Sequence, residues 1–455
     1  MRRASRVASP AAAAGAREEP SRVDPAWAWA PYEPSAERPW SLPLAGHLYR
    51  RAGFGATWRE LERALKEGPA RSVERFLRPE ADLEVFHRSQ DALADGAARG
   101  GSAQGVSAWW LRRMLETPHP LLEKMTLFWR GHFSATNARV KDAGLIERHV
   151  RLLRRHALGR FDALAEDVAH DPATLLALDA AANRRARPPE TYARRLLESF
   201  TVGPGNFSES DARGIARAFA GWFVLSGELR HVKLEEDPGP KRIFGREGTF
   251  DSREAVRIAA RQPAAARHVV KKLYRFFASE EEEPADELVA PLADRFAADR
   301  DIGALVETIL RSNLFFSPAA YRRKVKSPVE FALGIARGLE GLPATIPLAD
   351  ALARMGQDLS EPPTSEGWPG GRNWIDRWAV LEREKLARAL VSGAGYGRAL
   401  DPLETARRHG HEDPERARAF LVDLFLQGDL DPRSRAELAE GPAARVFTLP
   451  EFHLA

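Results

Sequence analysis

The stretch SESDARGIARAFAGWF, residues 208–223, carries both a start signal and an apolar face of a helix. Ser208 followed by Asp211 is typical of a capping box, with aspartate in the position that glutamate usually takes. Apolar side chains then recur at intervals of three and four, which places three of them on one face: Ile215, Phe219 and Trp222. We therefore predict a helix over residues 209–222 whose apolar face is part of the core.

The same helical periodicity covers most of the chain from about Pro39 onward. Three further helix starts pair an N-cap acid with a proline at the first helical position, after Asp401, Asp413 and Asp431. Alternating β-branched runs are almost absent, and the strand-like pieces are residues 201–207, 242–250 and 445–449. The predicted fold class is all-α, a large multi-helix array with at most a minor β-hairpin.

Composition divides the chain into three predicted regions. Residues 1–24 read as a disordered tail, and residues 25–39 place tryptophans among prolines, which suits an extended arm. Residues 40–455 read as a single large helical domain. No apolar run approaches the roughly 18 residues of a membrane-spanning helix. The alanine run near the start is too short for a secretory signal, so we predict a cytoplasmic protein, with export as the alternative.

Charge and composition exclude several classes of function. The 455 residues include 68 basic and 64 acidic side chains, and the two signs alternate along almost the whole chain. A nucleic-acid binder more often gathers its basic residues on one face or tail, so we predict no nucleic-acid partner. The lack of cysteine excludes a thiol nucleophile and cysteine-ligated zinc. The sequence also has no Walker A loop, GxSxG elbow, HExxH pair or GxGxxG turn.

A polar stripe in residues 190–203, ETYARRLLESFTVG, raises three alternatives. Glu190, Arg194 and Glu198 lie four apart, so on a helix they form one stripe. It could be an exposed ladder, a buried network or a catalytic face. We predict that Arg194 is at least half buried, that it clamps Glu198, Asp179 or Asp211, and that it ties this helix to the next one.

Candidate site residues follow from residue type and position. Carboxylates and an imidazole could supply acid–base chemistry if they meet, and the candidates are Glu190, Glu198, Asp237 and His132. Candidates for ligand binding, on the polar stripe and in two Gly/Pro-rich loops, are Arg194, Lys241, Trp368 and Trp374. His409 and His411 read as a helix end because no third ligand is identifiable, so no metal site is predicted and no cofactor is indicated.

Several ordered motifs resemble a bacterial family known as domain of unknown function 1800. The matching segments are residues 45–55 (AGHLYRRAGFG), 125–133 (MTLFWRGHF), 192–203, 211–222, 326–330 (KSPVE), 355–357 and 367–374. The resemblance covers about residues 40–390. It implies a mostly helical bacterial domain with no established activity or cofactor. It also implies a possible partner, since genes of relatives often neighbour those of a phosphatase- or sulfatase-like family.

The chain departs from the family pattern in its most polar motifs. It reads Pro189-Glu190-Thr191 where the family tends to read Asn-Glu-Asn, and Glu236-Asp237 where the family tends to read His-Asp. We therefore favour a binding or accessory protein with a divergent family pocket. The alternative is a hydrolase-like enzyme that uses Glu, Asp and His for acid–base or metal-assisted chemistry.

Overall fold

The computed structural model describes residues 23–281 and 283–455. The predicted tail therefore lies outside the described residues except for its last two positions. The first part of the chain forms helices α1 (Pro25–Trp29), α2 (Leu42–Ala52), α3 (Trp58–Leu77), α4 (Leu83–Arg99), α5 (Ala103–Glu116), α6 (Pro120–His132), α7 (Asn137–Val140), α8 (Ala143–His156), α9 (Phe161–Ala169), α10 (Pro172–Ala177) and α11 (Glu190–Arg195), the last continuing as a π-helix, η3 (Leu196–Phe200).

The second part of the chain continues the helical array around two small hairpins. Its helices are α12 (Glu209–Ala218), α13 (Ser252–Ala260), α14 (Pro263–Phe277), α15 (Asp286–Asp299), α16 (Ile302–Arg311), α17 (Pro328–Gly338), α18 (Thr345–Arg354), α19 (Arg377–Ser392), α20 (Pro402–Arg408), α21 (Pro414–Leu426) and α22 (Pro432–Glu440). Short 3₁₀ helices include η6 (Ala443–Thr448) and η7 (Pro450–His453). The antiparallel hairpins pair β1 (Trp222–Leu225) with β2 (Glu228–His231), and β3 (Lys241–Ile243) with β4 (Arg246–Gly248).

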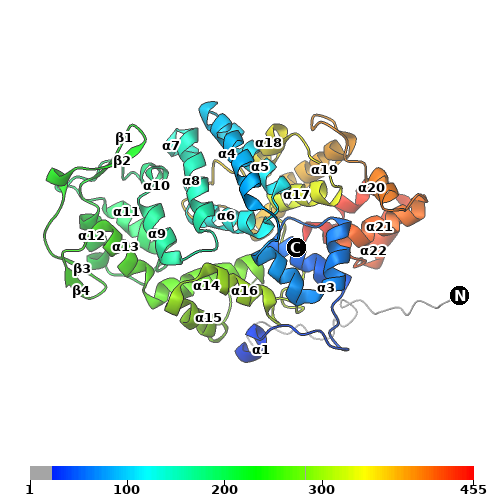
Figure 1. Cartoon of the computed structure of the whole chain (residues 1–455), viewed down its shortest axis with the longest axis horizontal. Helices are drawn as coiled ribbons and strands as arrows, with labels where there is room; N and C mark the ends of the chain where they lie inside the picture. Colours follow the sequence, from blue (N-terminus) through cyan, green and yellow to red (C-terminus); the bar gives the residue numbers. More distant parts are fainter. Residues whose placement is uncertain (1–22, 282) are drawn as a thin grey trace.

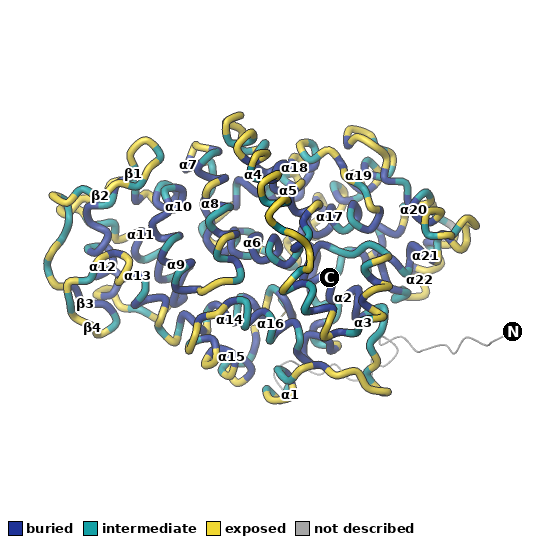
Figure 2. The backbone as a smooth tube through the Cα atoms, in the orientation of Figure 1, coloured by how far each residue is buried: buried dark blue, intermediate teal, exposed yellow. Residues whose placement is uncertain are grey.

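The helices form an elongated body (Figure 1). The hairpins and α10–α13 lie at one end, and α19–α22 lie at the other. Helices α6, α14 and α17 lie between the two ends, where the tube is largely buried (Figure 2). One contiguous apolar cluster runs from Tyr32 to Phe452, so the C-terminal helices share a core with the first ones. Among the described residues, no helix is long and apolar enough to cross a membrane.

The all-α prediction is confirmed, and so are the start signals on which it depends. Ser208 and Asp211 form a reciprocal capping box at the start of α12. The aspartates before α20, α21 and α22 each accept a backbone N–H of the first turn, with proline at the first helical position. These local signals define helix starts because they satisfy backbone donors that have no partner inside the helix.

The end of the 209–222 helix was predicted incorrectly. α12 ends at Ala218, and Trp222 begins β1 as a half-buried residue, whereas Ile215 and Phe219 are fully buried as expected. Gly221 has a φ of +94° and donates its N–H to the Asn183 carbonyl, so the chain turns away from the helix axis there. The glycine was visible in the sequence, but its long-range partner was not.

Of the three strand candidates, only residues 242–250 contain strands, in the β3/β4 hairpin. Residues 201–207 form a turn in which Asn206 donates to the Val202 carbonyl, and residues 445–449 lie mostly in η6. The β1/β2 hairpin was not predicted, because its strands are only four residues long and one of them is largely exposed.

The segment predicted as an extended arm opens with α1 and then runs along α15 and α16. Trp29 donates its indole N–H to the Leu288 carbonyl at 2.8 Å, and Tyr32 donates its backbone N–H to Arg311 at 2.7 Å. Tyr32 is buried against Phe316. The division into arm and body stays a prediction.

Candidate anion-binding site

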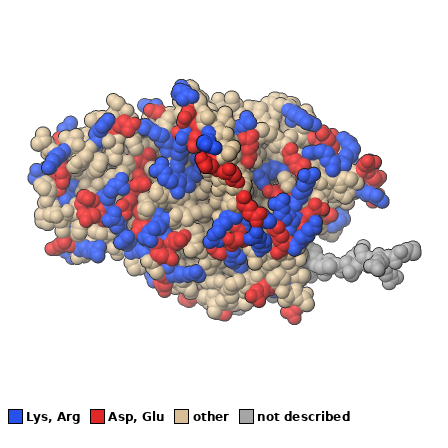
Figure 3. All heavy atoms as spheres, in the orientation of Figure 1, with Lys and Arg blue, Asp and Glu red and all other residues tan. Residues whose placement is uncertain are grey.

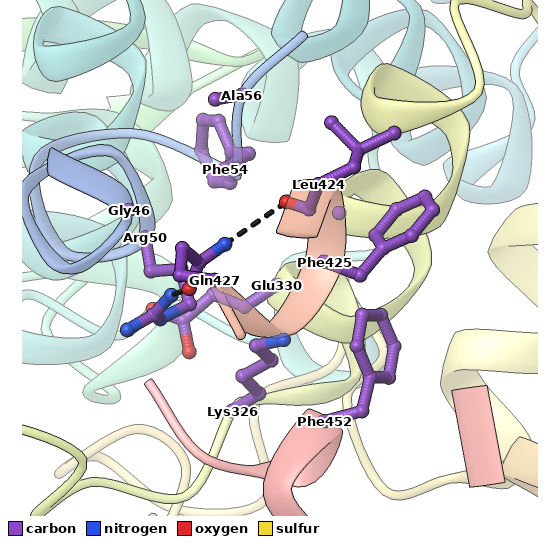
Figure 4. A pocket seen from close by; sticks show the side chains of 12 residues that line it. Gly46, Arg50, Phe54, Ala56, Lys326, Glu330, Leu424, Phe425, Gln427 and Phe452 are labelled. Carbon is purple, nitrogen blue, oxygen red and sulfur yellow. Dashed lines mark hydrogen bonds between the residues drawn. The ribbon is translucent and has the colours of Figure 1, made fainter. Parts of the chain in front are cut away.

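A small cavity of about 30 Å³ lies where α2, α17 and α21 meet the C-terminal 3₁₀ helix η7. Its walls come from segments far apart in the sequence, including Arg50 on α2, Lys326 and Glu330 at the start of α17, Gln427 after α21, and Phe452 (Figure 4). A cavity of this size has room for one or two water molecules. The cavity therefore suits a small group rather than a whole large ligand.

Two glycines in the 45–55 motif bring these walls together. An added Cβ at Gly46 would lie 2.3 Å from the Gln427 side chain, so Gln427 fits here only because residue 46 is a glycine. Gly55 has a φ of +97°, and its Cβ position is 3.2 Å from the Cα of Gly334 on α17. The glycines thus permit close approach of α17 and of the α21 C-terminus to α2.

Glu330 is the carboxylate at the base of the cavity. It forms a capping box with Ser327, whose N–H donates to Oε2 at 2.7 Å, while Oε1 accepts the Nζ atoms of Lys124 and, at 3.1 Å, Lys324. Burial alone would raise the pKa of Glu330, but the two ammonium groups outweigh it and hold that pKa far below its usual range. Glu330 therefore stays ionised.

Lys124 is a fully buried cation with a complete set of partners. Besides Glu330, its Nζ donates to the carbonyls of Gly53 at 2.8 Å and Arg50 at 3.2 Å. Burial lowers the pKa of Lys124 to about 8, although the Glu330 charge opposes that change. The contact ties α6 to α17 and to the loop after α2.

Arg50 is a buried cation that lacks a carboxylate partner among the described residues. Its Nη1 donates to the Oε1 of Gln427, its Nε and Nη2 are buried and form no hydrogen bond of good geometry, and the guanidinium carbon lies 5.9 Å from the centre of the Tyr321 ring. The Gln427 amide in turn donates to the Leu424 carbonyl at 2.9 Å, as Figure 4 shows. Burial lowers the pKa of Arg50 to about 10, so the guanidinium is still charged near neutral pH.

Lys326 is a second buried amine on the cavity wall, and only 4% of it is exposed. Its Nζ lies 3.7 Å from the centre of the Phe452 ring, and none of the described residues gives it a hydrogen bond or an ion pair. Burial lowers the pKa of Lys326 well below its usual value, and the nearby Arg50 and Arg322 charges lower it further. A counter-charge beside Lys326 would reverse that effect.

The surroundings of Glu330 contain more positive than negative charge. Arg51 and Arg383 also lie there, and both donate to backbone carbonyls instead of carboxylates: Arg51 to Phe277 and Ala278, Arg383 to Lys326. Seven basic groups (Arg50, Arg51, Lys124, Arg322, Lys324, Lys326 and Arg383) thus lie around three carboxylates, Glu330, Glu280 and Asp429. Over the surface in Figure 3, by contrast, the two signs are interspersed.

Such an excess of buried positive charge needs compensation. Buried charges in proteins are normally paired, and an unpaired one either gives up its proton or attracts a counter-ion. An arginine cannot readily give up its proton. The arrangement at Arg50 and Lys326 is therefore suited to holding an anion.

The four residues predicted as catalytic each bind to other partners and not to one another. Asp237 is held by Arg217 at 2.7 and 3.0 Å, the Glu198 carboxylate is 3.9 Å from Arg195, and Glu190 is exposed at the start of α11. His132 is buried and bonds to the Phe200 carbonyl and to Lys272. Within the described residues no hydrogen bond or ion pair joins any two of these four, and no group of three His, Asp or Glu side chains could hold a metal.

The four residues predicted to bind a ligand also differ in their surroundings. Lys241 donates to the carbonyls of Asp237 and Gly239, which anchors its own loop. Trp374 is buried, and Trp368 is half buried beside Gly131, next to His132. None of them lines the cavity.

Arg194 differs from its prediction in the identity of its partner. It forms two hydrogen bonds of 2.7 Å with Glu209, rather than with Glu198, Asp179 or Asp211. The pair ties α11 to α12, and more than half of the Arg194 side chain is buried, both as expected: 38% of the Arg194 side chain is exposed, against 66% of the Glu209 side chain. Asp211 was unavailable because it caps α12 and accepts the N–H of Phe244.

Arg50 and Lys326 were not selected from the sequence, although both lie in segments that carry the family resemblance. The available signal was a basic residue inside each of the two matched segments, AGHLYRRAGFG and KSPVE. No sequence pattern pointed to Gln427, because it lies 377 residues along the chain from its partner Arg50.

Comparison with known families agrees with the resemblance seen in the sequence. A family model described as "Protein of unknown function (DUF1800)" matches residues 47–448, nearly the whole chain and further toward the C-terminus than residue 390. The match includes Arg50, Lys326, Glu330 and Gln427. No curated protein and no solved structure matches the chain.

Proposed function

Because the chain belongs to the DUF1800 family and this family match spans the cavity between α2 and α17, we propose that it is a binding protein for an anionic group. The site consists of Arg50 and Lys326. The neutral side chain of Gln427 accepts a hydrogen bond from Arg50 when no anion is bound. The observation that carries the proposal is a buried guanidinium, Arg50, beside a buried amine, Lys326, on one cavity wall, neither of which has a carboxylate partner within ion-pair distance among the described residues.

The free atoms of Arg50 indicate an oxyanion. Nε and Nη2 form one edge of the guanidinium, and two oxygens of a carboxylate, phosphate or sulfate can bind such an edge side by side. Lys326 adds a point charge. The small cavity would accept only the anionic end of a ligand.

Calorimetric titration tests this proposal. We expect saturable binding of inorganic phosphate, sulfate or acetate to the full chain at constant ionic strength, with chloride as the reference salt. Lys326→Met and Arg50→Gln should each weaken that binding at least tenfold. Lys66→Met, at an exposed position on α3, is the matched control and should leave binding unchanged.

Gln427→Ala tests the proposed competition for Arg50. Removing the amide frees Nη1 and enlarges the cavity, so we expect tighter binding than in the unmodified protein. The proposal fails if none of the three anions binds at millimolar concentration, or if Lys326→Met and Lys66→Met bind alike.

We further propose that the chain acts with a phosphatase- or sulfatase-like protein encoded nearby. The family resemblance supports this partnership, and a site for a phosphate or sulfate group is consistent with it. Co-purification of the two proteins from the native cell, with and without Lys326→Met, tests it, and failure to co-purify in both cases would contradict it. The cytoplasmic location stays a prediction.

A further inference from the structure

The β1/β2 hairpin lies at one end of the elongated body, away from the proposed anion site (Figure 1). Two turns join it there: residues 184–187 (RRAR) and the 3₁₀ helix η4 (Lys233–Glu235), which follows β2 directly. The chain enters the first turn through a bridge between Ala182 and Phe223 of β1. The hairpin and the two turns therefore form one small surface.

Glu235 joins the two turns. Its Oε1 accepts a hydrogen bond from Arg184 Nη1 at 2.8 Å, and its Oε2 accepts the backbone N–H of Arg185 at 3.1 Å. The guanidinium carbon of Arg184 also lies 5.9 Å from the centre of the Phe223 ring. Arg230 is opposite Phe223 in the antiparallel register, so both side chains lie on the same face of the hairpin. Basic groups from separate segments thus meet around Phe223 and Glu235.

This surface, which we call the basic patch, carries unpaired positive charge. Its exposed basic side chains are Arg184, Arg185, Arg187, Arg230 and Lys233. Among the described residues, only the first of these forms an ion pair, with Glu235. The other acids of the hairpin and of the segment after it are Glu228, which Arg148 of α8 binds, and Glu236. Four unpaired cations therefore face one unpaired acid, whereas the signs are interspersed over the surface in Figure 3.

Apolar side chains project from the same patch. Leu234, in η4, is 93% exposed, the highest value for any large apolar side chain among the described residues. Leu225, two residues after Phe223 in β1, is 51% exposed and lies on the same face as Arg230. Such side chains gain free energy when they leave water. The patch thus combines free cations with exposed leucines.

We propose that the basic patch docks onto an anionic lipid surface, with Leu234 inserted between the headgroups. The cations bind the headgroup phosphates, and the leucine enters the apolar layer below them. A fluid surface can close around a single projecting side chain, whereas an acidic protein or a nucleic acid would pair with the cations and leave Leu234 in water. The position of the hairpin at one end of the body lets the patch reach a flat surface (Figure 1).

Vesicle co-sedimentation of the full chain tests the proposal. We expect binding to vesicles of phosphatidylcholine and phosphatidylglycerol in a two-to-one ratio, and about tenfold weaker binding to pure phosphatidylcholine. About 0.5 M NaCl should release most of the bound protein, because salt screens the attraction. Lys326→Met should bind these vesicles as the unmodified chain does, because the anion site is a separate feature. No binding to the anionic vesicles would overturn the proposal.

Two double variants separate the patch from the net charge of the chain. Arg185→Glu with Lys233→Glu should weaken vesicle binding about tenfold, because it reverses two cations of the patch. Arg59→Glu with Lys66→Glu, at exposed positions of α3, is the matched control and should bind normally. Each double variant lowers the formal net charge by four, from +4 to 0. Equal binding by the two double variants would overturn the proposal.

Leu234→Ser tests the lipid surface against a soluble acidic partner. The change removes the apolar side chain without altering the charge, so vesicle binding should weaken about fivefold. Leu65→Ser, at a leucine of α3 that is 39% exposed, is the control and should leave binding unchanged. If Leu234→Ser binds vesicles as tightly as the unmodified chain, the leucine does not enter the lipid. That result would overturn the proposal in favour of a soluble acidic partner.

Discussion

Two consecutive residues of α6, Glu123 and Lys124, belong to two different buried charge clusters. Glu123 accepts hydrogen bonds from Arg113, Arg154 and the Trp110 indole, while Lys124 donates to Glu330 on the other side of the helix. Around Glu123, further acids such as Glu147 and Asp95 offset the arginines. Around Glu330 and the cavity beside it, seven basic groups lie around three carboxylates.

The difference separates a cluster whose carboxylate is paired within the protein from a cluster that we propose binds an anion. The Glu123 carboxylate accepts hydrogen bonds from Arg113, Arg154 and Trp110, although Arg113 Nη1 is buried without a partner, and Glu123 does not line the cavity beside Arg50. The Glu330 cluster leaves atoms of Arg50 and the Lys326 amine unpartnered beside a cavity. A buried charge that the fold does not satisfy is costly to keep, so it points to a ligand.

The largest effect is expected for Glu123→Ala. The change leaves two buried guanidinium groups, Arg113 and Arg154, without their shared counter-charge. Breaking a buried pair from one side typically costs about 3–5 kcal/mol. Urea unfolding measures the loss, and Glu84→Ala, at an exposed acid on α4, is the control with little expected change. Equal losses for the two variants would show that the Glu123 cluster contributes nothing special.

Acid unfolding sharpens the same comparison. Burial by itself would raise the pKa of Glu123, but Arg154 and Arg113 outweigh it and bring that pKa to about 2 from an ordinary 4.5. A folded-state pKa below the unfolded one gives stability that is present above pH 4.5 and is lost as the pH falls toward 2. The difference corresponds to about 3 kcal/mol.

The measurement is the free energy of unfolding between pH 5 and 2 for the unmodified chain and for Glu123→Gln. The gap between the two proteins should be largest at pH 5 and should shrink as the pH falls. A gap that stays constant with pH would mean that Glu123 does not titrate in this range.

The fold could be predicted further than the site because its signals are local. The Ser208 capping box and the aspartate–proline starts lie within four residues of the helices that they define. Helix ends were less certain, as at Trp222, because Gly221 turns the chain through a contact with the distant Asn183. The switch from α11 to the π-helix η3 had no local signal.

The site depends on pairings that no local pattern contains. Lys124 and Glu330 are 206 residues apart, and Arg50 and Gln427 are 377 residues apart. Arg194 shows the same limit at short range: the tie between α11 and α12 was predictable from spacing, but the choice of Glu209 over Asp211 depended on the capping box. His132 was selected for its residue type, whereas its contact with Lys272 could not be predicted from the sequence.

A smaller effect, of either sign, is expected for Lys326→Met. Replacing a buried amine that has no ion-pair partner by an apolar side chain of similar length removes no strong contact, so we expect a change within about 1 kcal/mol. This contrasts with the loss expected for Glu123→Ala. Urea unfolding should also show that added sulfate stabilises the unmodified chain but not Lys326→Met. A large loss in the variant would place Lys326 among the structural cations.

The smallest effect is expected for Arg194→Ala, which compares both buried clusters with a surface pair. Arg194 binds Glu209 with good geometry, but most of the Glu209 side chain is exposed, so water and salt screen the pair. The neighbouring Arg195 is also partly exposed and lies 3.9 Å from Glu198. Urea unfolding of Arg194→Ala and Arg195→Ala should therefore give similar midpoints, and 0.5 M NaCl should remove any remaining difference. A selective, salt-insensitive loss in Arg194→Ala would restore the buried clamp first predicted from the sequence. It would also mean that exposure is a poor guide to the energetic weight of ion pairs in this chain, including those around Glu330.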